Sequence, residues 1–354
     1  MKKYLVFLLV AILMLSLVLV GCGSSDEIGK EGEGEGEEEV GEKDPPKTKQ
    51  QITILTGSTG GTYFALGGAM ANTWTDYLDN IQVTSQPSGA SVENINRLNA
   101  GEVELGISMN NIADNAWNGV GAFDKKTQNF RTIGVVYPEV YQGVALKESG
   151  IVNLEDVKGK RVAVGPVGSG TVVLTEAVFA EAGLTFDDVK ANSDGFGDAA
   201  SKMQDGQLDA AFNVLSVPAA AIEEILTTRE INIIEISDDL FAKLKAKHPF
   251  FSQYYIPAGT YGNTEDVKTI NCQAALYCSP DLSEDMVYEI TKVWAEHTAE
   301  VATAHNAAKW LADEIAGGNL QVILEGITTP LHKGAYKYYL EKGLDIPDEI
   351  KPID

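Results

Sequence analysis

Two glycine-rich segments hold the residues best suited to binding chemistry in this sequence. They are Gly57-Ser58-Thr59-Gly60-Gly61-Thr62-Tyr63 and Gly165-Pro166-Val167-Gly168-Ser169-Gly170-Thr171. Each follows an apolar, strand-like run and precedes a helical pattern, so converging backbone N–H groups and the positive end of a helix face the loop. The serine and threonine hydroxyls add donors that adapt to a ligand. Together these groups can bind a carboxylate without an arginine.

Neither loop matches a known phosphate-binding motif. A phosphate loop of the Walker A type needs a lysine before its last Ser or Thr, and neither segment has one. A dinucleotide fingerprint needs a third glycine, which the run 168–174 lacks. Each loop could also be only a tight turn followed by a helix N-cap. A matching pair of loops in one chain favours a binding site.

The sequence nominates no catalytic residue. It contains neither H-E-x-x-H nor G-x-S-x-G. A Ser58 or Ser169 nucleophile would need a positioned base, and none is evident. We expect the four scattered histidines at the surface or at helix ends: His248, His297, His305 and His332. We therefore predict a binding protein with no metal site, no cofactor and no enzymatic activity.

Alternating strands and helices must position the two loops. Strands are predicted at 51–56, 81–86, 104–108, 161–164, 209–213 and 231–236. Helices are predicted at 63–78, 91–100, 112–119, 172–182, 199–204 and 218–226, the last with Pro218 in its first turn. The C-terminal region is predicted to be helical at 284–300, 302–315 and 331–342.

Two long extended stretches connect these units: 131–147, with an interruption at Pro138, and 269–279. The alternation predicts an α/β fold with two lobes, in which the long stretches cross between them. We place lobe 1 at 51–137 and 262–354, and lobe 2 at 138–261. Small ligands bind such sheets beyond the carboxyl ends of the strands, where the two glycine-rich loops lie.

Composition excludes one class of partner and one kind of cross-link. The 354 residues include 51 acidic and 27 basic ones, for a net charge of -24. Nucleic-acid binding needs a basic face, so we exclude it. Cys272 and Cys278 fall in one predicted strand, where their spacing spans ~20 Å. A disulfide needs Cα atoms ~6 Å apart, so we predict two free, buried thiols.

The first 22 residues are predicted to be a lipoprotein signal peptide. Lys2 and Lys3 precede an apolar run, and Leu19-Val20-Gly21-Cys22 closes it. This ending resembles a bacterial lipobox, in which Cys22 is lipidated; an uncleaved N-terminal anchor is the alternative. Residues 23–50 contain ten acidic residues, and we expect a disordered acidic tether there. The mature chain would be extracytoplasmic, lipid-anchored to the outer face of the cytoplasmic membrane.

Six short segments add a further indication. They are Thr56–Tyr63 with Leu66-Gly67, Asn94-Ile95 with Leu98, the run 156–162 leading to 168–171, the run 209–212 leading to Pro218, the run 256–261, and 331–335 with Tyr338-Tyr339. In this order they resemble the TAXI-type solute receptors of TRAP transporters, over nearly all of 51–352.

The resemblance implies a two-lobed periplasmic-binding-protein fold, or Venus flytrap, with crossover strands between the lobes. It implies capture of a small carboxylate, of the glutamate or glutamine type, by lobe closure and its delivery to a TRAP permease in the membrane. A receptor that presents its closed form to a membrane signalling protein is the alternative, and a tethered enzyme is a third possibility without an acid–base pair to support it.

The resemblance also implies which residues bind the ligand. Met109 and Asn111 stand where relatives carry Gln and Asp, so the pocket is expected to be less polar than theirs. The implied ligand-binding residues are Ser58, Thr59, Gly60, Gly61, Thr62 and Tyr63 from one lobe, Ser169, Gly170 and Thr171 from the other, and Asn110, Tyr137, Asn213 and Pro218 as further lining.

Overall fold

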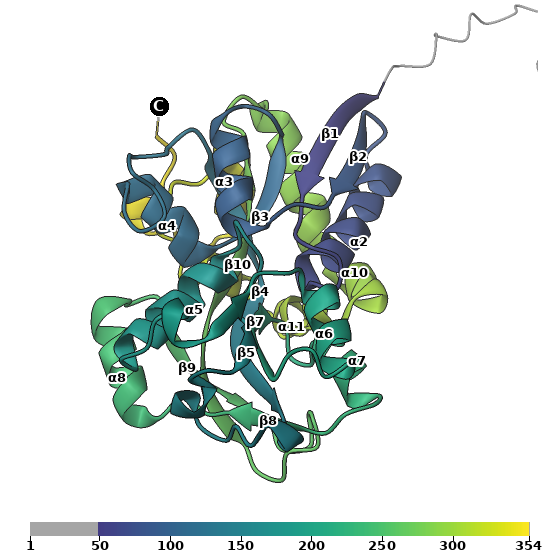
Figure 1. Ribbon diagram of the computed structural model, residues 1–354. Helices are drawn as coiled ribbons and strands as arrows, with labels where there is room; N and C mark the ends of the chain where they lie inside the picture. Colours follow the sequence, from purple (N-terminus) through teal and green to yellow (C-terminus); the bar gives the residue numbers. More distant parts are fainter. Residues whose placement is uncertain (1–48, 354) are drawn as a thin grey trace, which may run out of the picture. The chain divides into compact units, whose positions relative to one another are not determined.

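The computed structural model describes residues 49–353 (Figure 1). The predicted signal peptide, its Cys22 and the predicted acidic tether up to residue 48 lie outside the described residues. Within 49–353, no helix is both long and apolar enough to cross a membrane.

Strands and helices alternate along the described chain. The strands are β1 Gln50–Leu55, β2 Ile81–Gln86, β3 Leu105–Met109, β4 Arg131–Leu146, β5 Arg161–Ala163, β6 Lys190–Asn192, β7 Ala210–Leu215, β8 Ile231–Ile234, β9 Ser252–Ile256 and β10 Val267–Cys278. The α-helices are α2 Thr62–Tyr77, α3 Ser91–Asn99, α4 Asn110–Asn118, α5 Gly170–Glu181, α6 Phe196–Gln204, α7 Ala220–Leu226, α8 Asp238–Lys247, α9 Glu284–Glu296, α10 Thr298–Ala304, α11 Lys309–Ala316 and α12 Lys333–Glu341.

All ten of these strands join one sheet that has two parallel halves. The order is β2-β1-β3-β10-β4-β7-β5-β6, with β8 added on β4 and β9 added on β10. Strands β2, β1 and β3 pair in parallel, and so do β7, β5 and β6. Between them β10 and β4 pair antiparallel. Each parallel half, with the helices around it, forms one lobe, and the predicted two-lobed α/β fold with crossover strands is confirmed.

Strand β4 belongs to both halves. Its residues up to Val140 pair with β10, and those from Val140 onward pair with β7 and β8. The predicted interruption at Pro138 is wrong, because Pro138 lies within the strand, opposite Gln273. Val136 has no opposite residue on β10, since Tyr137 pairs with Ala274 and Val135 with Ala275. Proline is tolerated in a sheet beside such a bulge.

Several helix boundaries differ from the prediction. Helix α7 begins at Ala220 rather than Pro218, because Ala219 is extended and donates its N–H to the Tyr261 hydroxyl. The predicted helices 284–300 and 302–315 are broken at His297 and His305, which end α9 and α10. Strands β6 and β9 and helix α8 were not predicted.

The cysteines and histidines lie where the sequence predicts. Cys272 and Cys278 are free and buried. His248 is the C-terminal cap of α8, and the His332 side chain accepts a hydrogen bond from the Gly334 N–H at the start of α12. His305 caps the short helix that follows it in the same way.

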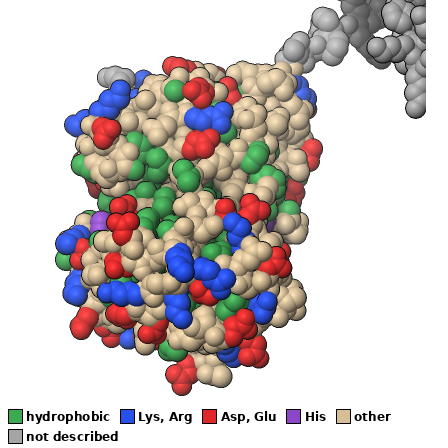
Figure 2. All heavy atoms as spheres, in the orientation of Figure 1, with side chains coloured by type: hydrophobic (Ala, Val, Ile, Leu, Met, Phe, Trp, Pro, Cys, Tyr) green, Lys and Arg blue, Asp and Glu red, His purple; other side chains and the backbone are tan. Residues whose placement is uncertain are grey.

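Apolar packing holds the sheet between its helices. One large core includes Trp74 of α2 and Trp294 of α9, and a smaller one groups Phe196 and Met203 of α6 with Ile222 of α7. In the view of Figure 2, apolar side chains gather in a band between the lobe built on β1–β3 and the lobe built on β5–β7, whereas charged side chains cover the second lobe.

Candidate functional site

The loops that follow β1 and β5 meet at one small cavity. Its volume is about 20 Å³, close to the space that one water molecule needs. A larger solute can therefore enter only when the lobes lie further apart than here. No Lys, Arg or His is among the residues that line this cavity. The lining residues are Gly57, Ser58, Gly61, Thr62, Tyr63, Ala90, Ser91, Met109, Tyr137, Glu139, Ser169, Gly170, Thr171, Phe196, Val214 and Leu215.

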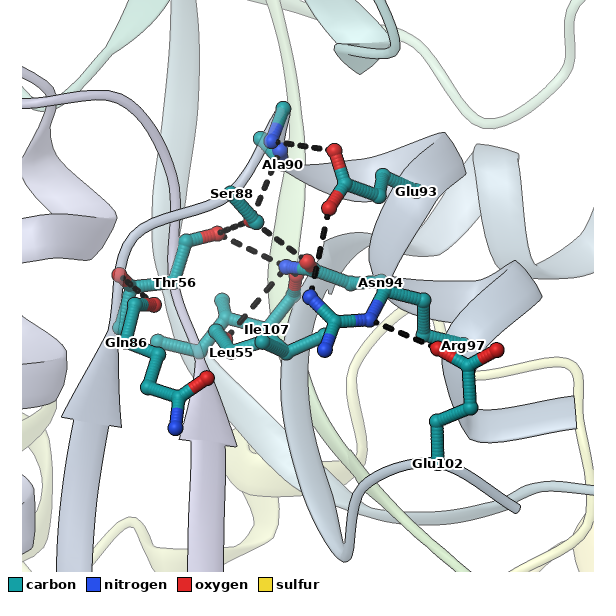
Figure 3. A network of polar contacts seen from close by, with 11 residues as sticks. Leu55, Thr56, Gln86, Ser88, Ala90, Glu93, Asn94, Arg97, Glu102 and Ile107 are labelled. Atoms are coloured by element: carbon teal, nitrogen blue, oxygen red, sulfur yellow. Dashed lines mark hydrogen bonds and ion pairs between the residues drawn. The ribbon is translucent and has the colours of Figure 1, made fainter. Parts of the chain in front are cut away.

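Asn94 of α3 holds the first loop in place (Figure 3). Its side-chain amide donates to the carbonyls of Thr56 and Ile107, both at 2.8 Å, and its Oδ1 accepts from the Ser88 hydroxyl at 2.7 Å. These bonds tie the end of β1 and the middle of β3 to the turn after β2. The same Ser88 oxygen accepts the N–H of Ala90, which lines the cavity and has a φ of +76°. A non-glycine residue in that region is strained and is found mainly at functional sites.

The second loop is a helix cap whose side chain is already occupied. The Ser169 hydroxyl donates to the Pro166 carbonyl at 2.6 Å and accepts the Val172 N–H at 3.2 Å, so it caps α5. Gly170 faces Met109, and a Cβ at this position would collide with the Met109 sulfur. Thr171 is 3% exposed and also lines the cavity. Its hydroxyl is therefore the one in this loop that is best placed to bind a ligand.

Hydrogen bonds close the cavity from one lobe to the other. The Gly168 carbonyl accepts from the N–H groups of Val92 at 3.0 Å and Glu93 at 3.2 Å. On another side, the Thr62 hydroxyl lies 3.1 Å from the Ser216 hydroxyl and accepts the Ser216 N–H. The approach of the lobes at these points leaves little room for side chains. A Cβ at Gly89 would lie 2.7 Å from the Val167 carbonyl oxygen.

One carboxyl group, Glu139, opens onto the cavity from β4. Its Oε2 accepts from the Tyr63 hydroxyl at 2.7 Å and its Oε1 from the Tyr137 hydroxyl at 3.3 Å. The two tyrosine rings meet edge to face, with centroids 6.2 Å apart. Burial raises the pKa of Glu139 to about 8, although both tyrosine hydrogen bonds lower it. The group is therefore largely protonated at neutral pH.

The structure places the predicted site residues in two sets. Ser58, Gly61, Thr62, Tyr63, Tyr137, Ser169, Gly170 and Thr171 line the cavity, whereas Thr59, Gly60, Asn110, Asn213 and Pro218 do not. The Thr59 carbonyl accepts from the Gly197 N–H at the rim, and a Cβ at Gly60 would lie 2.7 Å from that nitrogen. Asn110 instead bonds the Gly326 carbonyl and the Gln273 N–H.

The last two residues of that set have other roles in the structure. The Asn213 amide donates to the Gln142 carbonyl within the sheet, and the Pro218 carbonyl accepts from Ser216. Both therefore hold backbone segments rather than face the cavity. Asn111, flagged as a departure from relatives, is buried outside the lining, while Met109 lines the cavity.

The sequence-based prediction omits several lining residues, among them Glu139, Ser91 and Phe196. Glu139 did leave a signal: it is the single charged residue between Arg131 and Lys147 in an otherwise apolar run. A lone charge inside a buried strand marks a candidate functional group, since carboxylates are rarely buried without a partner. Ser91 and Phe196 carry no comparable signal, because each begins an ordinary helix.

Comparison with solved structures gives several similar chains. A protein from Bordetella bronchiseptica RB50 is 17% identical, with 85% of this chain and 91% of that chain covered and a TM-score of 0.48. The periplasmic aliphatic sulphonate binding protein SsuA from Escherichia coli is 15% identical, with 83% and 84% covered and a TM-score of 0.39. A putative L-cystine ABC transporter protein from Listeria monocytogenes is 14% identical, with 75% and 95% covered and a TM-score of 0.45.

Comparison with protein families gives a match over most of the chain. The matched family is described as the NMT1-like family, and the match spans residues 54–343. That span contains both glycine-rich loops, the two crossover strands β4 and β10, and all residues that line the cavity. The chain therefore belongs to the NMT1-like family.

Proposed function

We propose that this chain is an extracytoplasmic solute receptor that captures a small carboxylate, of the glutamate or glutamine type, between its lobes. The observation that carries the proposal is the meeting of two glycine-rich loops, one from each lobe, at a single small cavity. Helices α2 and α5 both begin there, and their first N–H groups have no acceptor within the helix. With the Thr62 and Thr171 hydroxyls, these groups suit an anionic group in a site without a lysine or arginine.

Binding would work by closure. The first lobe contributes Ser58 and Thr62, and the second contributes Gly170 and Thr171. A solute that bonds to both sets favours the closed arrangement, because only that arrangement brings both sets to it. The lobe-to-lobe hydrogen bonds at Gly168 and Ser216 add to this preference once the solute is inside.

We further propose that the receptor is of the TAXI type, anchored by a lipid at Cys22, and that it delivers its solute to a TRAP permease. The six segments described above support this part. An ionophore that collapses ion gradients should then abolish uptake of the solute by cells. Uptake that needs ATP and survives the ionophore would overturn the TRAP assignment, and a neighbouring sensor kinase with no uptake would favour the signalling receptor.

A thermal-shift screen tests the binding function. The purified protein is denatured and refolded to remove carried-over ligand, then heated with amino acids, oxo-acids, dicarboxylates and sugars. A solute at 100 times its dissociation constant stabilises the fold by ~2.7 kcal/mol. A shift limited to carboxylates supports the proposal, and a shift limited to uncharged solutes overturns the ligand class.

A further inference from the structure

Glu139 is unusual among the acidic residues of the described chain. Within 49–353 it is the one Asp or Glu whose side chain is buried, with 3% exposure. It lies on β4, opposite Cys272 of β10, at the point where the sheet passes from one lobe to the other. Its carboxyl group faces the cavity into which both glycine-rich loops open.

The surroundings of Glu139 leave it without a cation. Tyr63 of α2 and Tyr137 of β4 donate one hydrogen bond each, and each carboxyl oxygen can accept more than one. The other titratable groups near it are the Cys272 thiol and the Tyr277 hydroxyl of β10, both buried and neutral. No Lys, Arg or His lines the cavity in the described chain. Acceptor capacity therefore remains on a carboxyl group in a nearly dry site.

A purely structural role does not account for this arrangement. An amide at this position would accept from one tyrosine hydroxyl and donate to the other, without the cost of burying an ionisable group. What a carboxyl group adds is the ability to become an anion beside a bound cation. Tyr63 and Tyr137 are already oriented to stabilise that anion, because their hydroxyls donate to its two oxygens.

We propose that Glu139, oriented by Tyr63 and Tyr137, binds the ammonium group of the captured solute, whose carboxylate lies at the starts of α2 and α5. The inference rests on the proposed function and names the side chain that recognises the amino group of a glutamate- or glutamine-type solute. An oxo-acid or a dicarboxylate without an amino group would leave Glu139 unpaired.

Proton balance gives the proposal a distinctive readout. Glu139 enters the binding reaction as a neutral carboxylic acid, and the solute enters with its ammonium group charged. On binding, the Glu139 O–H bond breaks, its proton goes to solvent, and a carboxylate–ammonium pair forms. Since the pKa of Glu139 in the folded chain is about 8, binding at pH 7 releases about one proton, and affinity rises up to about tenfold per pH unit below pH 8.

Calorimetry of the refolded protein tests the inference. L-glutamate, L-glutamine and 2-oxoglutarate are titrated at pH 7 in phosphate and in Tris, whose ionisation heats differ. We expect a buffer-dependent heat that corresponds to proton release for the two amino acids, and binding of 2-oxoglutarate that is at least tenfold weaker. E139Q, which keeps the shape of the side chain, should remove both the proton release and the preference. E155Q alters an exposed glutamate and serves as the control.

The failure of the inference can be told apart from the failure of the proposed function. If 2-oxoglutarate binds as tightly as glutamate, without proton release and regardless of E139Q, the ammonium site is wrong while the carboxylate receptor stands. If no carboxylate binds to the folded wild-type protein, the proposed function itself is wrong. If E139Q does not fold, Y63F with its intact carboxyl group provides the second test, and an unchanged pH profile in Y63F overturns the inference.

Discussion

The hydroxyl of Tyr63 lies 2.7 Å from Oε2 of Glu139, although 76 residues separate them along the chain. One stands in the first turn of α2, directly after the first glycine-rich loop, and the other stands in the middle of the crossover strand β4. The contact therefore links the loop proposed to bind the solute's carboxylate with the group proposed to bind its ammonium.

Glu139 should make the stability of the ligand-free protein depend on pH. Its pKa rises from an ordinary value of 4.5 to about 8 on folding. Between these values the folded chain binds the proton and the unfolded chain does not, so stability falls as pH rises from 4.5 to 8. The slope is up to about 1.4 kcal/mol per pH unit. Urea unfolding from pH 4.5 to 8.5 should show this slope in the wild type and its loss in E139Q. An identical profile in both proteins would contradict the assignment.

Y63F should move the titration of Glu139 to higher pH. The tyrosine hydroxyl stabilises the carboxylate, so its removal raises the pKa of Glu139 above about 8. The pH at which ligand affinity reaches its plateau should shift upward in the same direction. Y141F is the matched control, because Tyr141 is equally buried in β4 but stacks on Phe212. Equal shifts in both variants would indicate a general effect of packing.

G89A should hold the lobes apart. The new methyl group would lie 2.7 Å from the Val167 carbonyl oxygen across the lobe boundary, so closure must stop short. We expect ligand affinity to fall at least tenfold with little change in the melting temperature of the free protein. G68A is the control: no atom lies within 4 Å of its Cβ, and alanine stabilises a helix by about 1 kcal/mol relative to glycine. Small-angle X-ray scattering with ligand should find only G89A more open than the wild type.

Two neighbouring hydroxyls of the second loop should give different phenotypes. The Ser169 hydroxyl caps α5, so S169A should lower stability by about 1 kcal/mol. Thr171 has no capping role, so T171A should weaken ligand binding by ~1–3 kcal/mol and leave stability unchanged. Thermal unfolding and calorimetry measure the two effects separately. If alanine at Ser58, Thr62, Ser169 and Thr171 leaves ligand binding unchanged in all four variants, the two loops do not form the binding site.

N94A should destabilise the first lobe and loosen the first loop. The Asn94 amide satisfies buried carbonyls at the end of β1 and in the middle of β3, and its loss should cost about 2–3 kcal/mol. R97A, one turn later on α3, removes only the partly exposed ion pairs with Glu93 and Glu102 and should cost less than about 1 kcal/mol. Urea unfolding distinguishes them. Equal losses would place the stabilising contact elsewhere.

The local sequence pattern predicts the fold class, but it does not predict every helix and strand boundary. Strand β2 matches its prediction at both ends, because its alternating residues are bounded by Asn80 and Pro87. Helix α8 was missed since only Leu240 and Leu244 are buried along it, too few to show a helical period. The breaks at His297 and His305 were missed because apolar spacing continues through them.

The candidate site, too, can be predicted from the sequence only in part. The two glycine-rich loops can be recognised from their composition, and residues from both line the cavity. The predicted site omits Glu139 because the predicted extended stretch is interrupted at Pro138, and because the partner residue Tyr63 is distant in sequence. Asn110 directly follows strand β3, and Asn213 lies within strand β7. Only the tertiary structure shows that the amide groups of both donate to backbone carbonyls.

Strand β4 has a mechanical consequence for the order of events. It runs without a break through both halves of the sheet, so any swing of one lobe against the other turns about this strand and its neighbour β10. Glu139 lies on this strand, so an opening of the lobes is expected to displace it less than residues further from the strand. A solute can thus bind Glu139 by its ammonium group while the lobes are still open. The two glycine-rich loops would then bind its carboxylate only when the lobes close.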